Sequence, residues 1–297
     1  MTIPFLSRLD AGPTKLWREL LAQSLGEPII AGLPDDRASV EIAVVANPAP
    51  GELATLPNLK FIQSAWAGVD GLMTDPALPR HAVLARLIDP TLAAQMAEAV
   101  TAHVLALHRQ APAYAVQQAK GLWNKLPQPP TTARQVGLLG YGEMGRACAK
   151  MLEAVGFPVS HWTRSQGDLG DLLARSEIVV NLLPLTPETQ GILGAETFER
   201  MRPGAAIISV GRGGHLVEAD LIPALDSGRL SHAVLDVFAV EPLPTDHPFW
   251  RHPRITVTPH AAAITDPASG ARQVASNIAR FRAGEPVVGR VSFDAGY

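Results

Sequence analysis

Three glycines at fixed spacing constrain the fold of this chain more than any other feature. Gly140, Gly142 and Gly145 form a G-x-G-x-x-G array in GLLGYGEMG, directly after a strand-like run and at the start of a helix-like run. Such glycines provide a tight turn, a close approach of the backbone to pyrophosphate, and close packing of helix on strand. The N-terminus of the helix adds amide donors and a positive dipole end. The array therefore predicts a dinucleotide-binding domain.

The chain around the array alternates between two kinds of segment. Helix-like segments, such as 143–156 and 217–228, separate β-rich runs. This alternation predicts a parallel, doubly wound sheet. The β-rich runs are 135–139, 157–162, 177–183, 205–211, 232–238 and 254–258.

The two ends of the chain predict a second, smaller α/β unit. Short apolar runs at 42–46, 60–64 and 82–85 are typical of buried strands, because turn residues bound each of them. Residues 14–26 have helical spacing. The amphipathic segment 268–284 is expected to fold back on this unit.

A long helix is predicted between the two units. Pro90 and Thr91 suit the start of a helix, and the rest of the segment 89–110 is rich in Ala and Leu and contains no Gly or Pro. Pro112 marks a break, and the prolines of 117–133 indicate a boundary or an extended arm.

Composition excludes several classes of protein. The chain is 47% hydrophobic and 18% charged, which is typical of a globular protein, and its net charge is −3 at pH 7. Because it has no basic field, we expect no nucleic-acid partner. The N-terminus does not resemble a signal peptide, and no apolar run approaches the ~20 residues that span a bilayer. We therefore expect a cytoplasmic protein without membrane contact.

Cysteine and histidine usage argues against disulfides and metals. Cys148 is the sole cysteine, which excludes an intramolecular disulfide and a multi-cysteine metal site. Its place in a helical pattern predicts a small buried side chain rather than a reactive thiol. The nine histidines show no convincing metal-ligand spacing, so no metal is expected.

The segment HWTRSQG, residues 161–167, bears on the choice of cofactor. About twenty residues after the glycine array, NAD-binding domains usually place an acid that binds the ribose 2′-OH. Here the position holds Thr163, Arg164 and Ser165, and the first acid, Asp168, comes later. A guanidinium pairs with a 2′-phosphate, which a carboxylate would repel. The segment favours NADP(H), with NAD(H) as a weaker ligand. The alternative is a solvated surface arginine.

Polar residues also follow the other predicted strands. Pro184 and Arg212 each follow one strand, Asp236 and Glu241 accompany the next, and His260 follows the last. In an open α/β sheet ligands bind outside the carboxyl ends of the strands. We therefore expect these side chains to converge on one site.

The chemistry of these residues suits the reduction of a 2-oxo acid. Arg212 can bind the substrate carboxylate and polarise the ketone. His260 can donate the proton that the ketone oxygen needs after hydride transfer, while Glu241 orients the ring and favours the imidazolium. Asp236 is expected to bind the nicotinamide carboxamide. Taken singly, Arg212 could instead cap a turn, Glu241 could be a surface charge, and His260 could be a satisfied histidine at a strand end.

The order of these motifs resembles that of the D-isomer-specific 2-hydroxyacid dehydrogenases. After GLLGYGEMG come NLLPLTPETQGIL, SVGRGGHLVEADLIPALDSGRL, AVLDVFAVEPLP and TVTPHAAAIT, in family order. The resemblance runs from about Lys60 to the C-terminus. It implies that Arg212, Glu241 and His260 form the catalytic set.

The resemblance also implies a two-domain α/β fold. Residues 1–92 and 268–297 would form a flavodoxin-like substrate domain. Residues 93–267 would form an NADP-binding domain with a Rossmann-type doubly wound parallel sheet. Within it, the helix and arm of 93–130 would make a homodimer.

A substrate loop and a set of cofactor contacts are implied as well. In AWAGVD, the backbone amides of Ala67 and Gly68 would bind the substrate carboxylate. Trp66 departs from the family pattern, which has a small residue there, and is expected either to line the pocket or to belong to the core or an interface. The residues expected to contact the cofactor are Gly140, Tyr141, Gly142, Glu143, Met144, Gly145, Thr163, Arg164, Ser165, Leu183, Pro184, Val210, Gly211, Asp236 and Ala262.

The expected activity is NADPH-dependent reduction of small 2-oxo acids, glyoxylate to glycolate and hydroxypyruvate to D-glycerate. The nearest alternative is a reductase of a bulkier 2-oxo acid such as phenylpyruvate. A second alternative is a non-catalytic NADP(H)-sensing protein, which the presence of Arg212, Glu241 and His260 disfavours.

Overall fold

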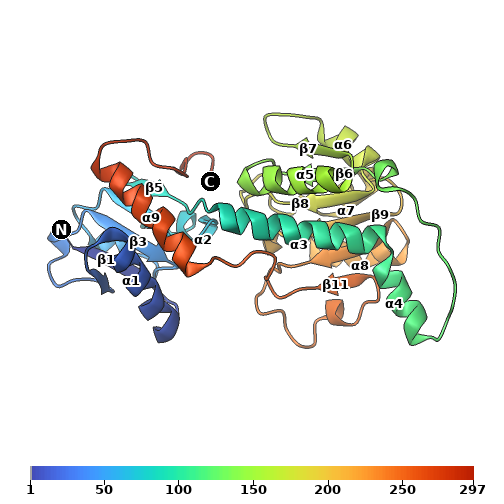
Figure 1. Cartoon of the computed structure of the whole chain (residues 1–297), viewed down its shortest axis with the longest axis horizontal. Coiled ribbons are helices and arrows are strands. Elements are labelled where there is room, and N and C mark those ends of the chain that lie inside the picture. The colour runs from blue at the N-terminus through green and yellow to red at the C-terminus, as the bar shows by residue number, and fades with distance from the viewer. Residues whose placement is uncertain (1) are drawn as a thin grey trace. The chain divides into compact units, whose positions relative to one another are not determined.

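A computed structural model describes residues 2–297, which divide into two compact units (Figure 1). The first unit is built from both ends of the chain, up to Leu92 and from Thr265 onward. The second unit spans Ala93–Ile264. Both are α/β units with parallel sheets. The assignment of substrate binding to the first unit and cofactor binding to the second stays a prediction.

The first unit contains a five-stranded parallel sheet in the order β2-β1-β3-β4-β5. The three strands that the apolar runs predict are present. The sequence interpretation missed the other two, because Pro4 interrupts one run and the second is only three residues long. The strands are β1 (Ile3–Ser7), β2 (Ile29–Ala31), β3 (Ile42–Ala46), β4 (Phe61–Ser64) and β5 (Val83–Ala85).

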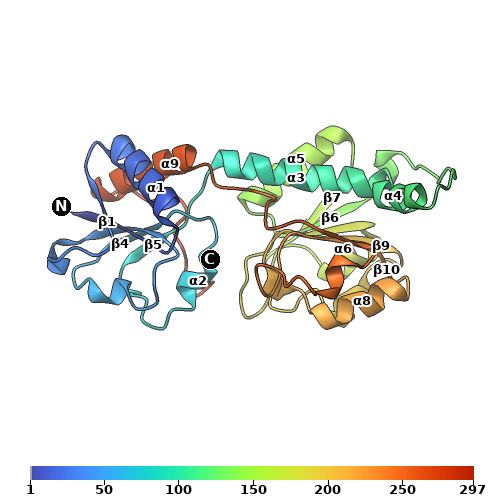
Figure 2. The ribbon, with the colours of Figure 1, turned by 90° about the horizontal axis from the view of Figure 1, so that it is seen from below.

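Two helices cover one face of this sheet. α1 (Ala11–Leu25) and α9 (Pro267–Arg282) lie side by side, and Trp17 of α1 packs in one core with Val274 and Ile278 of α9 (Figure 2). The short α2 (Asp70–Met73) lies on the opposite face. The predicted return of the C-terminal helix to this unit is therefore confirmed.

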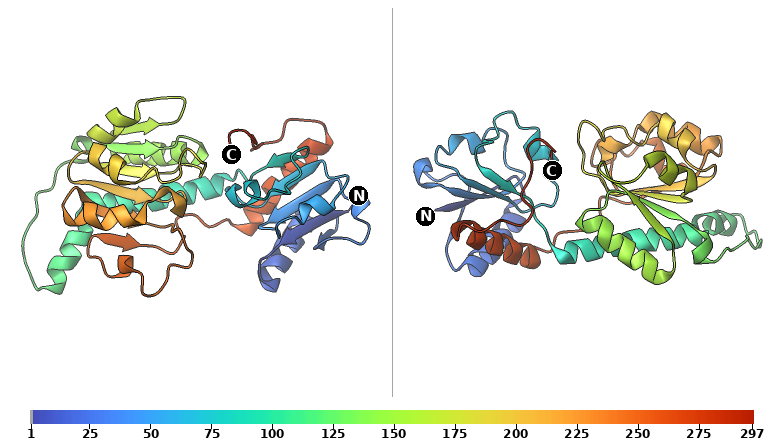
Figure 3. Two further views of the ribbon diagram at one scale, coloured as in Figure 1. Left: turned by 180° about the vertical axis from the view of Figure 1, so that it is seen from behind. Right: turned by 90° about the horizontal axis from the view of Figure 1, so that it is seen from above.

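The segment after α9 closes the edge of the sheet. It runs back along β5 in antiparallel orientation, where the amide of Val291 donates to the carbonyl of Leu84 at 2.8 Å (Figure 3). The buried Asn277 of α9 anchors this return: its Nδ2 donates to Gln63 Oε1 (2.8 Å) and to the carbonyl of Val288 (2.7 Å), and its Oδ1 accepts from the amide of Val288 (2.8 Å). A covered edge cannot pair with other strands.

The second unit contains a six-stranded sheet in the order β11-β10-β9-β8-β6-β7, in which every pair is parallel. All six predicted strands are present. The inner strands β6, β8 and β9 are buried throughout, as a sheet covered on both faces requires, whereas the edge strands β7 and β11 are only partly buried. The strands are β6 (Val136–Leu139), β7 (Val159–Trp162), β8 (Ile178–Asn181), β9 (Ala205–Ser209), β10 (Leu230–Leu235) and β11 (Ile255–Val257).

Helices pack on both faces of this second sheet. α3 (Pro90–His108) and α5 (Glu143–Val155) cover one face. α6 (Leu169–Arg175), α7 (Ala195–Arg200) and α8 (Glu218–Asp226) cover the other. Across the described residues, 2–297, no helix combines the length and apolar character needed to cross a membrane.

Two details of the helical layer follow from the sequence as predicted. The long helix breaks before Pro112: Gln110 adopts a left-handed conformation (φ 59°), and the separate α4 (Ala111–Ala119) follows. Cys148 of α5 is fully buried, and burial raises the pKa of its thiol to about 12. The thiol is therefore protonated and unreactive at neutral pH.

The order of strands reverses between β6 and β8. From β6 the chain turns to β7 on one side and then crosses to β8 on the other. Doubly wound sheets bind their ligands at such a reversal, outside the carboxyl ends of the two central strands. Parallel pairing places the loops after β9, β10 and β11 at the same edge.

Replacing Asn277 by Ala tests the anchor of the C-terminal segment. We expect the free energy of unfolding of the first unit to fall by about 2–3 kcal/mol, because the change leaves buried polar groups of Gln63 and Val288 without partners. Urea titration measures this loss. Asn58→Ala, which removes one exposed hydrogen bond to the carbonyl of Ala38, is the control and should cost less than ~1 kcal/mol. Equal losses in the two variants would contradict the anchoring role.

Candidate active site

The glycine loop connects β6 to α5. Gly140 lies in the left-handed region (φ 99°), and Gly142 is the N-cap residue of α5. A Cβ on Gly145 would lie 2.3 Å from the carbonyl oxygen of Gly140, so only glycine allows this close packing of helix on strand. A Cβ on Gly142 would meet nothing within 4 Å. The first and third glycines are thus required by the fold, whereas the second leaves open space beside the N-terminus of the helix.

The other residues of the loop contact their neighbours in the chain and on β7. The ring of Tyr141 stacks on His161 at the end of β7, with 3.6 Å between centroids and 7° between planes. Glu143, in the first turn of α5, forms an ion pair with Arg146. Met144 is half-buried. The amide end of α5 therefore borders the loop of the edge strand β7.

Arg164 and Ser165 lie at the tip of a tight turn that follows β7. Reciprocal backbone hydrogen bonds between Thr163 and Gln166, at 2.9 and 3.1 Å, close the turn. The hydroxyls of Thr163 and Ser165 are 3.3 Å apart. Asp168, the first acid after β7, is the N-cap of α6 and accepts from the amide of Asp171 at 3.0 Å. The acid therefore serves the helix, and the turn presents a cation and two hydroxyls.

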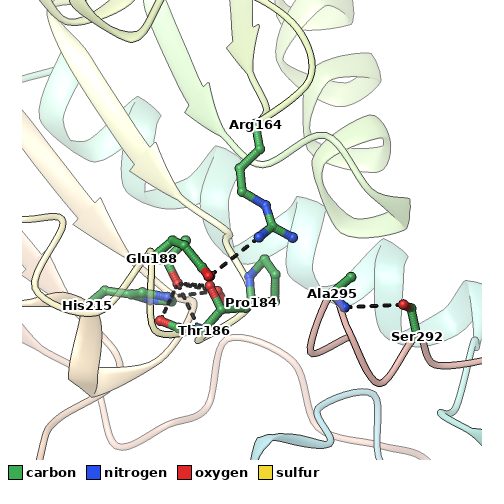
Figure 4. A network of polar contacts seen from close by, with 8 residues as sticks. Arg164, Pro184, Thr186, Glu188, His215, Ser292 and Ala295 are labelled. Atoms are coloured by element: carbon green, nitrogen blue, oxygen red, sulfur yellow. Dashed lines mark hydrogen bonds and ion pairs between the residues drawn. The ribbon is translucent and has the colours of Figure 1, made fainter.

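Glu188, which the sequence interpretation did not single out, lies opposite this turn. Its Oε2 is 3.4 Å from Nη1 of Arg164, and both side chains are exposed (Figure 4). A hydrogen bond from the side chain of Thr186, with a further contribution from Arg164, lowers the pKa of the Glu188 carboxyl. Because an exposed pair of this kind is worth less than about 1 kcal/mol, a dianionic phosphate can displace Glu188 from Arg164.

Arg212 begins the loop that follows β9. Its backbone is extended (φ −144°, ψ 148°), and its Nη1 donates to the carbonyl of Gly211 at 2.8 Å. The side chain is half-buried. A Cβ on the next residue, Gly213, would lie 1.9 Å from the backbone of Phe238. The loop of Arg212 is therefore pressed against the segment that leads from β10 to Glu241.

Glu241 and His260 form a hydrogen-bonded pair. Oε2 of Glu241 is 2.8 Å from Nδ1 of His260, and Oε1 accepts from the amide of Phe238 at 2.9 Å. Since a carboxylate accepts, Nδ1 of His260 carries the hydrogen and its Nε2 faces away from Glu241. The side chain of His260 is 48% exposed, so Nε2 is accessible to a ligand.

His260 has a strained backbone that Asp236 holds in place. Its φ of 52° lies in the left-handed region, which costs a residue other than glycine about 1–2 kcal/mol. The carboxylate of the buried Asp236 accepts from the hydroxyl of Thr258 (2.6 Å) and from the amides of Ala261 (2.8 Å) and Ala262 (3.0 Å). The carbonyl of Asp236 also accepts from the amide of His260 at 2.9 Å. These four bonds clamp both sides of His260.

The clamp bears on the predicted role of Asp236. Its two carboxylate oxygens already accept three hydrogen bonds from the His260 loop, and lone pairs remain for another donor. Binding of the nicotinamide carboxamide by Asp236 stays a prediction. The sequence interpretation missed a second role of Asp236, the positioning of the His260 loop. Asp236 follows β10, whereas the donors to its carboxylate follow β11.

The other predicted cofactor residues occupy the ends of the central strands. Leu183 and Pro184 follow β8, and Val210 and Gly211 follow β9. A Cβ on Gly211 would lie 3.0 Å from the carbonyl oxygen of Leu183, so the two loops are in close contact. Val210 and Ala262 are buried in the core beneath α3 and α5. Contact of these residues with a cofactor stays a prediction.

The predicted substrate loop follows β4 in the first unit. The backbone amide of Trp66 donates to Oγ of Ser64 at 3.0 Å, which fixes the position of Trp66. The ring meets Trp17 edge to face, with 5.8 Å between centroids, and packs against the core of this unit. Its Nε1 is buried without a hydrogen-bond partner among residues 2–297. Ala67 and Gly68 follow, both half-buried. Their contact with a substrate stays a prediction.

The described residues offer no candidate metal site. Among residues 2–297, no group of three or more His, Cys, Asp or Glu side chains is placed to hold a metal ion. The site instead consists of an arginine, a hydrogen-bonded His–Glu pair and a glycine loop, all at the carboxyl edge of one sheet. This set can bind anions and transfer a proton.

Comparison with known proteins finds a matching sequence family and a relative that aligns with nearly the whole chain. Residues 101–262 match the sequence family described as D-isomer specific 2-hydroxyacid dehydrogenase, NAD binding domain. Glyoxylate/hydroxypyruvate reductase A of Serratia proteamaculans is 38% identical over 299 residues, which cover 95% of this chain and 96% of that protein.

Two solved structures are similar over the whole chain. A D-isomer specific 2-hydroxyacid dehydrogenase from Xanthobacter autotrophicus, in complex with NADPH and MES, is 37% identical with a TM-score of 0.94 and covers 100% of this chain and 99% of its own. The NADPH-dependent glyoxylate/hydroxypyruvate reductase of Sinorhizobium meliloti, in complex with NADP and sulfate, is 36% identical with a TM-score of 0.91 and the same coverage.

Two glycine variants separate the fold of the loop from its ligand. Gly142→Ala should leave the free energy of unfolding within about 0.5 kcal/mol of the wild type, because the new Cβ meets no atom of the chain. It should nevertheless weaken dinucleotide binding at least ~tenfold, because the methyl group occupies the space of the pyrophosphate. Thermal unfolding and isothermal titration with NADPH measure the two effects.

Gly145→Ala is the counterpart in the same loop. Its Cβ collides with the carbonyl oxygen of Gly140, so it should cost about 1–3 kcal/mol of stability as well as affinity. Gly71→Ala, at a site with nothing within 4 Å in the other unit, should change neither property. Unchanged affinity in Gly142→Ala would show that the pyrophosphate does not lie over this loop.

Proposed function

The chain belongs to the D-isomer-specific 2-hydroxyacid dehydrogenase family, and we propose that it reduces small 2-oxo acids with NADPH. The preferred substrates are glyoxylate, which becomes glycolate, and hydroxypyruvate, which becomes D-glycerate. The observation that carries the proposal is the His260–Glu241 pair, which shares one sheet edge with Arg212 and the glycine loop. The names of the Serratia and Sinorhizobium relatives support this choice of substrates.

The second unit fits a phosphorylated dinucleotide. The open space beside Gly142 and the amide end of α5 would receive the pyrophosphate. Arg164, with the hydroxyls of Thr163 and Ser165, would bind the 2′-phosphate that distinguishes NADPH from NADH. When bound, NADPH supplies the hydride that the carbonyl carbon of the substrate accepts.

Arg212 binds and polarises the substrate. A guanidinium pairs with the substrate carboxylate in a planar, bidentate geometry. The same cation attracts the ketone oxygen, on which negative charge develops as the carbonyl carbon gains the hydride. The extended backbone of Arg212 and the close contact of Gly213 with Phe238 hold this group at the end of β9.

His260 supplies the proton. Its Nε2–H donates to the ketone oxygen, so the O–H bond of the hydroxy acid forms as the Nε2–H bond breaks. The imidazole becomes neutral and regains a proton from solvent, which reaches the exposed side chain. Glu241 accepts from Nδ1–H throughout, which fixes the tautomer and offsets the charge of the imidazolium.

The first unit completes the proposed enzyme as a substrate domain, comprising 1–92 and 268–297. The amides of Ala67 and Gly68 would bind the substrate carboxylate, and Trp66 would limit the size of the substrate. The remaining residues, 93–267, would form the cofactor domain. We further propose a homodimer through α3, α4 and the arm up to residue 130, which is supported by the 96% exposure of Trp123.

Cofactor choice is the most direct test. Assayed with a panel of 2-oxo acids, the wild type should show a kcat/KM for NADPH at least ~tenfold above that for NADH. Arg164→Ser should lower kcat/KM for NADPH by about 10–100-fold, since it removes a charge-assisted hydrogen bond, and should leave the value for NADH within about threefold.

Arg175→Ser is the matched control for Arg164. Arg175 is an exposed arginine of α6 that pairs with Asp171, and its loss should alter neither cofactor. Equal use of NADH and NADPH by the wild type would contradict the role of Arg164. NADPH binding without oxidation across the panel would instead favour a sensing protein, and preference for phenylpyruvate would favour a bulkier substrate.

His260→Ala should separate chemistry from binding. Loss of the proton donor should lower kcat by about 10²–10⁴-fold. The Kd for NADPH, measured by titration calorimetry, should stay within about threefold. His252→Ala is the control, because His252 pairs with Asp226 at the amino end of β11, at the opposite edge of the sheet. Equal losses of turnover and cofactor affinity in His260→Ala would contradict its role as the acid.

A further inference from the structure

A buried histidine joins the two loops that follow β8 and β9. His215 is fully buried and closes a short turn, Gly213–His215, that begins directly after Arg212. We propose that His215 is a positioning residue that sets the backbone of Arg212 against the cofactor loop after β8. The inference rests on the proposed function for the roles of the two loops, whereas the contacts of His215 stand by themselves.

The hydrogen bonds of the ring determine its tautomer. Nδ1 lies 3.1 Å from the amide nitrogen of Arg212 and 3.0 Å from Nδ2 of Asn181. Oδ1 of Asn181 accepts from the amide of Leu183 at 3.2 Å, so its Nδ2 is the donor side. Because both neighbours donate, Nδ1 of His215 is an acceptor. Nε2 lies 3.2 Å from the carbonyl oxygen of Pro184, which can only accept, so Nε2 carries the hydrogen.

Each ring nitrogen therefore serves a different loop. Nδ1 receives the backbone amide of Arg212, the residue that would bind the substrate carboxylate. Nε2–H holds the carbonyl of Pro184, which also accepts from the hydroxyl of Thr189 at 2.7 Å. The same loop carries Thr186 and Glu188, and Glu188 reaches Arg164 (Figure 4). A continuous polar network thus extends from Arg164 to His215 and on to Arg212.

Backbone contacts make this connection rigid. The amide of Gly191 donates to the carbonyl of Gly214, and the amide of Leu193 donates to the carbonyl of His215, both at 2.9 Å. A Cβ on Gly211 would lie 3.1 Å from Nδ1 of His215, so the ring has no free space beside it. Because the ring cannot move aside, the loss of one of its hydrogen bonds should displace the backbone of Arg212.

Two substitutions separate the two halves of the ring. Asn places an amide oxygen close to the position of Nδ1, so His215→Asn keeps the acceptor for Arg212 and loses the donor to Pro184. Gln places an amide NH₂ close to the position of Nε2, so His215→Gln keeps the donor and loses the acceptor. The two variants therefore predict opposite defects.

We expect one variant to change the KM for the 2-oxo acid and the other to change the Kd for NADPH. His215→Gln should raise the KM for the 2-oxo acid at least ~tenfold and leave the Kd for NADPH within about threefold, because Arg212 loses its backbone partner. His215→Asn should raise the Kd for NADPH at least ~tenfold and leave the KM for the 2-oxo acid within about threefold. A purely structural histidine would instead give both variants the same loss in both parameters, and that result would overturn the proposal, as would no change in either.

The control is another buried histidine of the same unit. His232 lies on β10, four residues before Asp236, and its ring contacts Thr256 of the neighbouring strand β11 at 2.9 Å, so it joins two strands rather than two loops. His232→Asn and His232→Gln measure the general effect of replacing a buried imidazole. They should change thermal stability, but neither variant should change the KM for the 2-oxo acid and the Kd for NADPH by different factors.

A measurement on the wild type does not depend on folding of the variants or on turnover. Long-range ¹H–¹⁵N correlation spectra report which ring nitrogen carries the hydrogen. We expect His215 in the Nε2–H form, and an Nδ1–H or doubly protonated ring would overturn the proposal. If the wild type binds NADPH but reduces no 2-oxo acid, the proposed function fails, while the tautomer and the Kd of His215→Asn still decide the role of His215.

Discussion

Parallel strand pairing is the constraint on which the rest of the second unit depends. Parallel strands all end at one edge of the sheet, so loops that are far apart in the sequence must share that edge. This brings the glycine loop after β6, Arg212 after β9, Glu241 after β10 and His260 after β11 into one region. The reversal of strand order between β6 and β8 is also the position at which doubly wound sheets bind dinucleotides. The proposed chemistry needs all of these groups together.

Buried polar anchors hold the exposed groups of this edge. Asp236 clamps the strained loop of His260, and His215 ties the amide of Arg212 to the loop of Pro184. Both anchors are almost inaccessible to water, where an unpaired polar group costs about 1–3 kcal/mol. Their partners are mostly backbone amides and carbonyls, which cannot rotate away. The buried anchors therefore make the site rigid, while Arg164 and His260 remain exposed for ligands.

Much of the fold follows from local pattern. Six strand predictions of the second unit, the long helix and the break before Pro112 agree with the structure, because apolar runs and proline act over a few residues. β1 and β2 were missed because Pro4 and short length conceal them, and their place in the sheet depends on pairing with β3. At the site, the pairing of His260 with Glu241 was predicted from residue chemistry. The roles of Asp236 and His215 as anchors were not, because their partners come from other strand connections.

The sequence by itself determined the glycine loop, the alternation of strands and helices, and the residue types at the strand ends. These depend on backbone conformation and on side-chain chemistry, both of which the residues of a short segment determine by themselves. Only the tertiary structure decided that Asp168 caps α6, that Glu188 faces Arg164, and which hydrogen bonds Asp236 and His215 make. Such contacts join segments from different strands. They form only after parallel pairing has brought the loops to one edge, so no single segment specifies them.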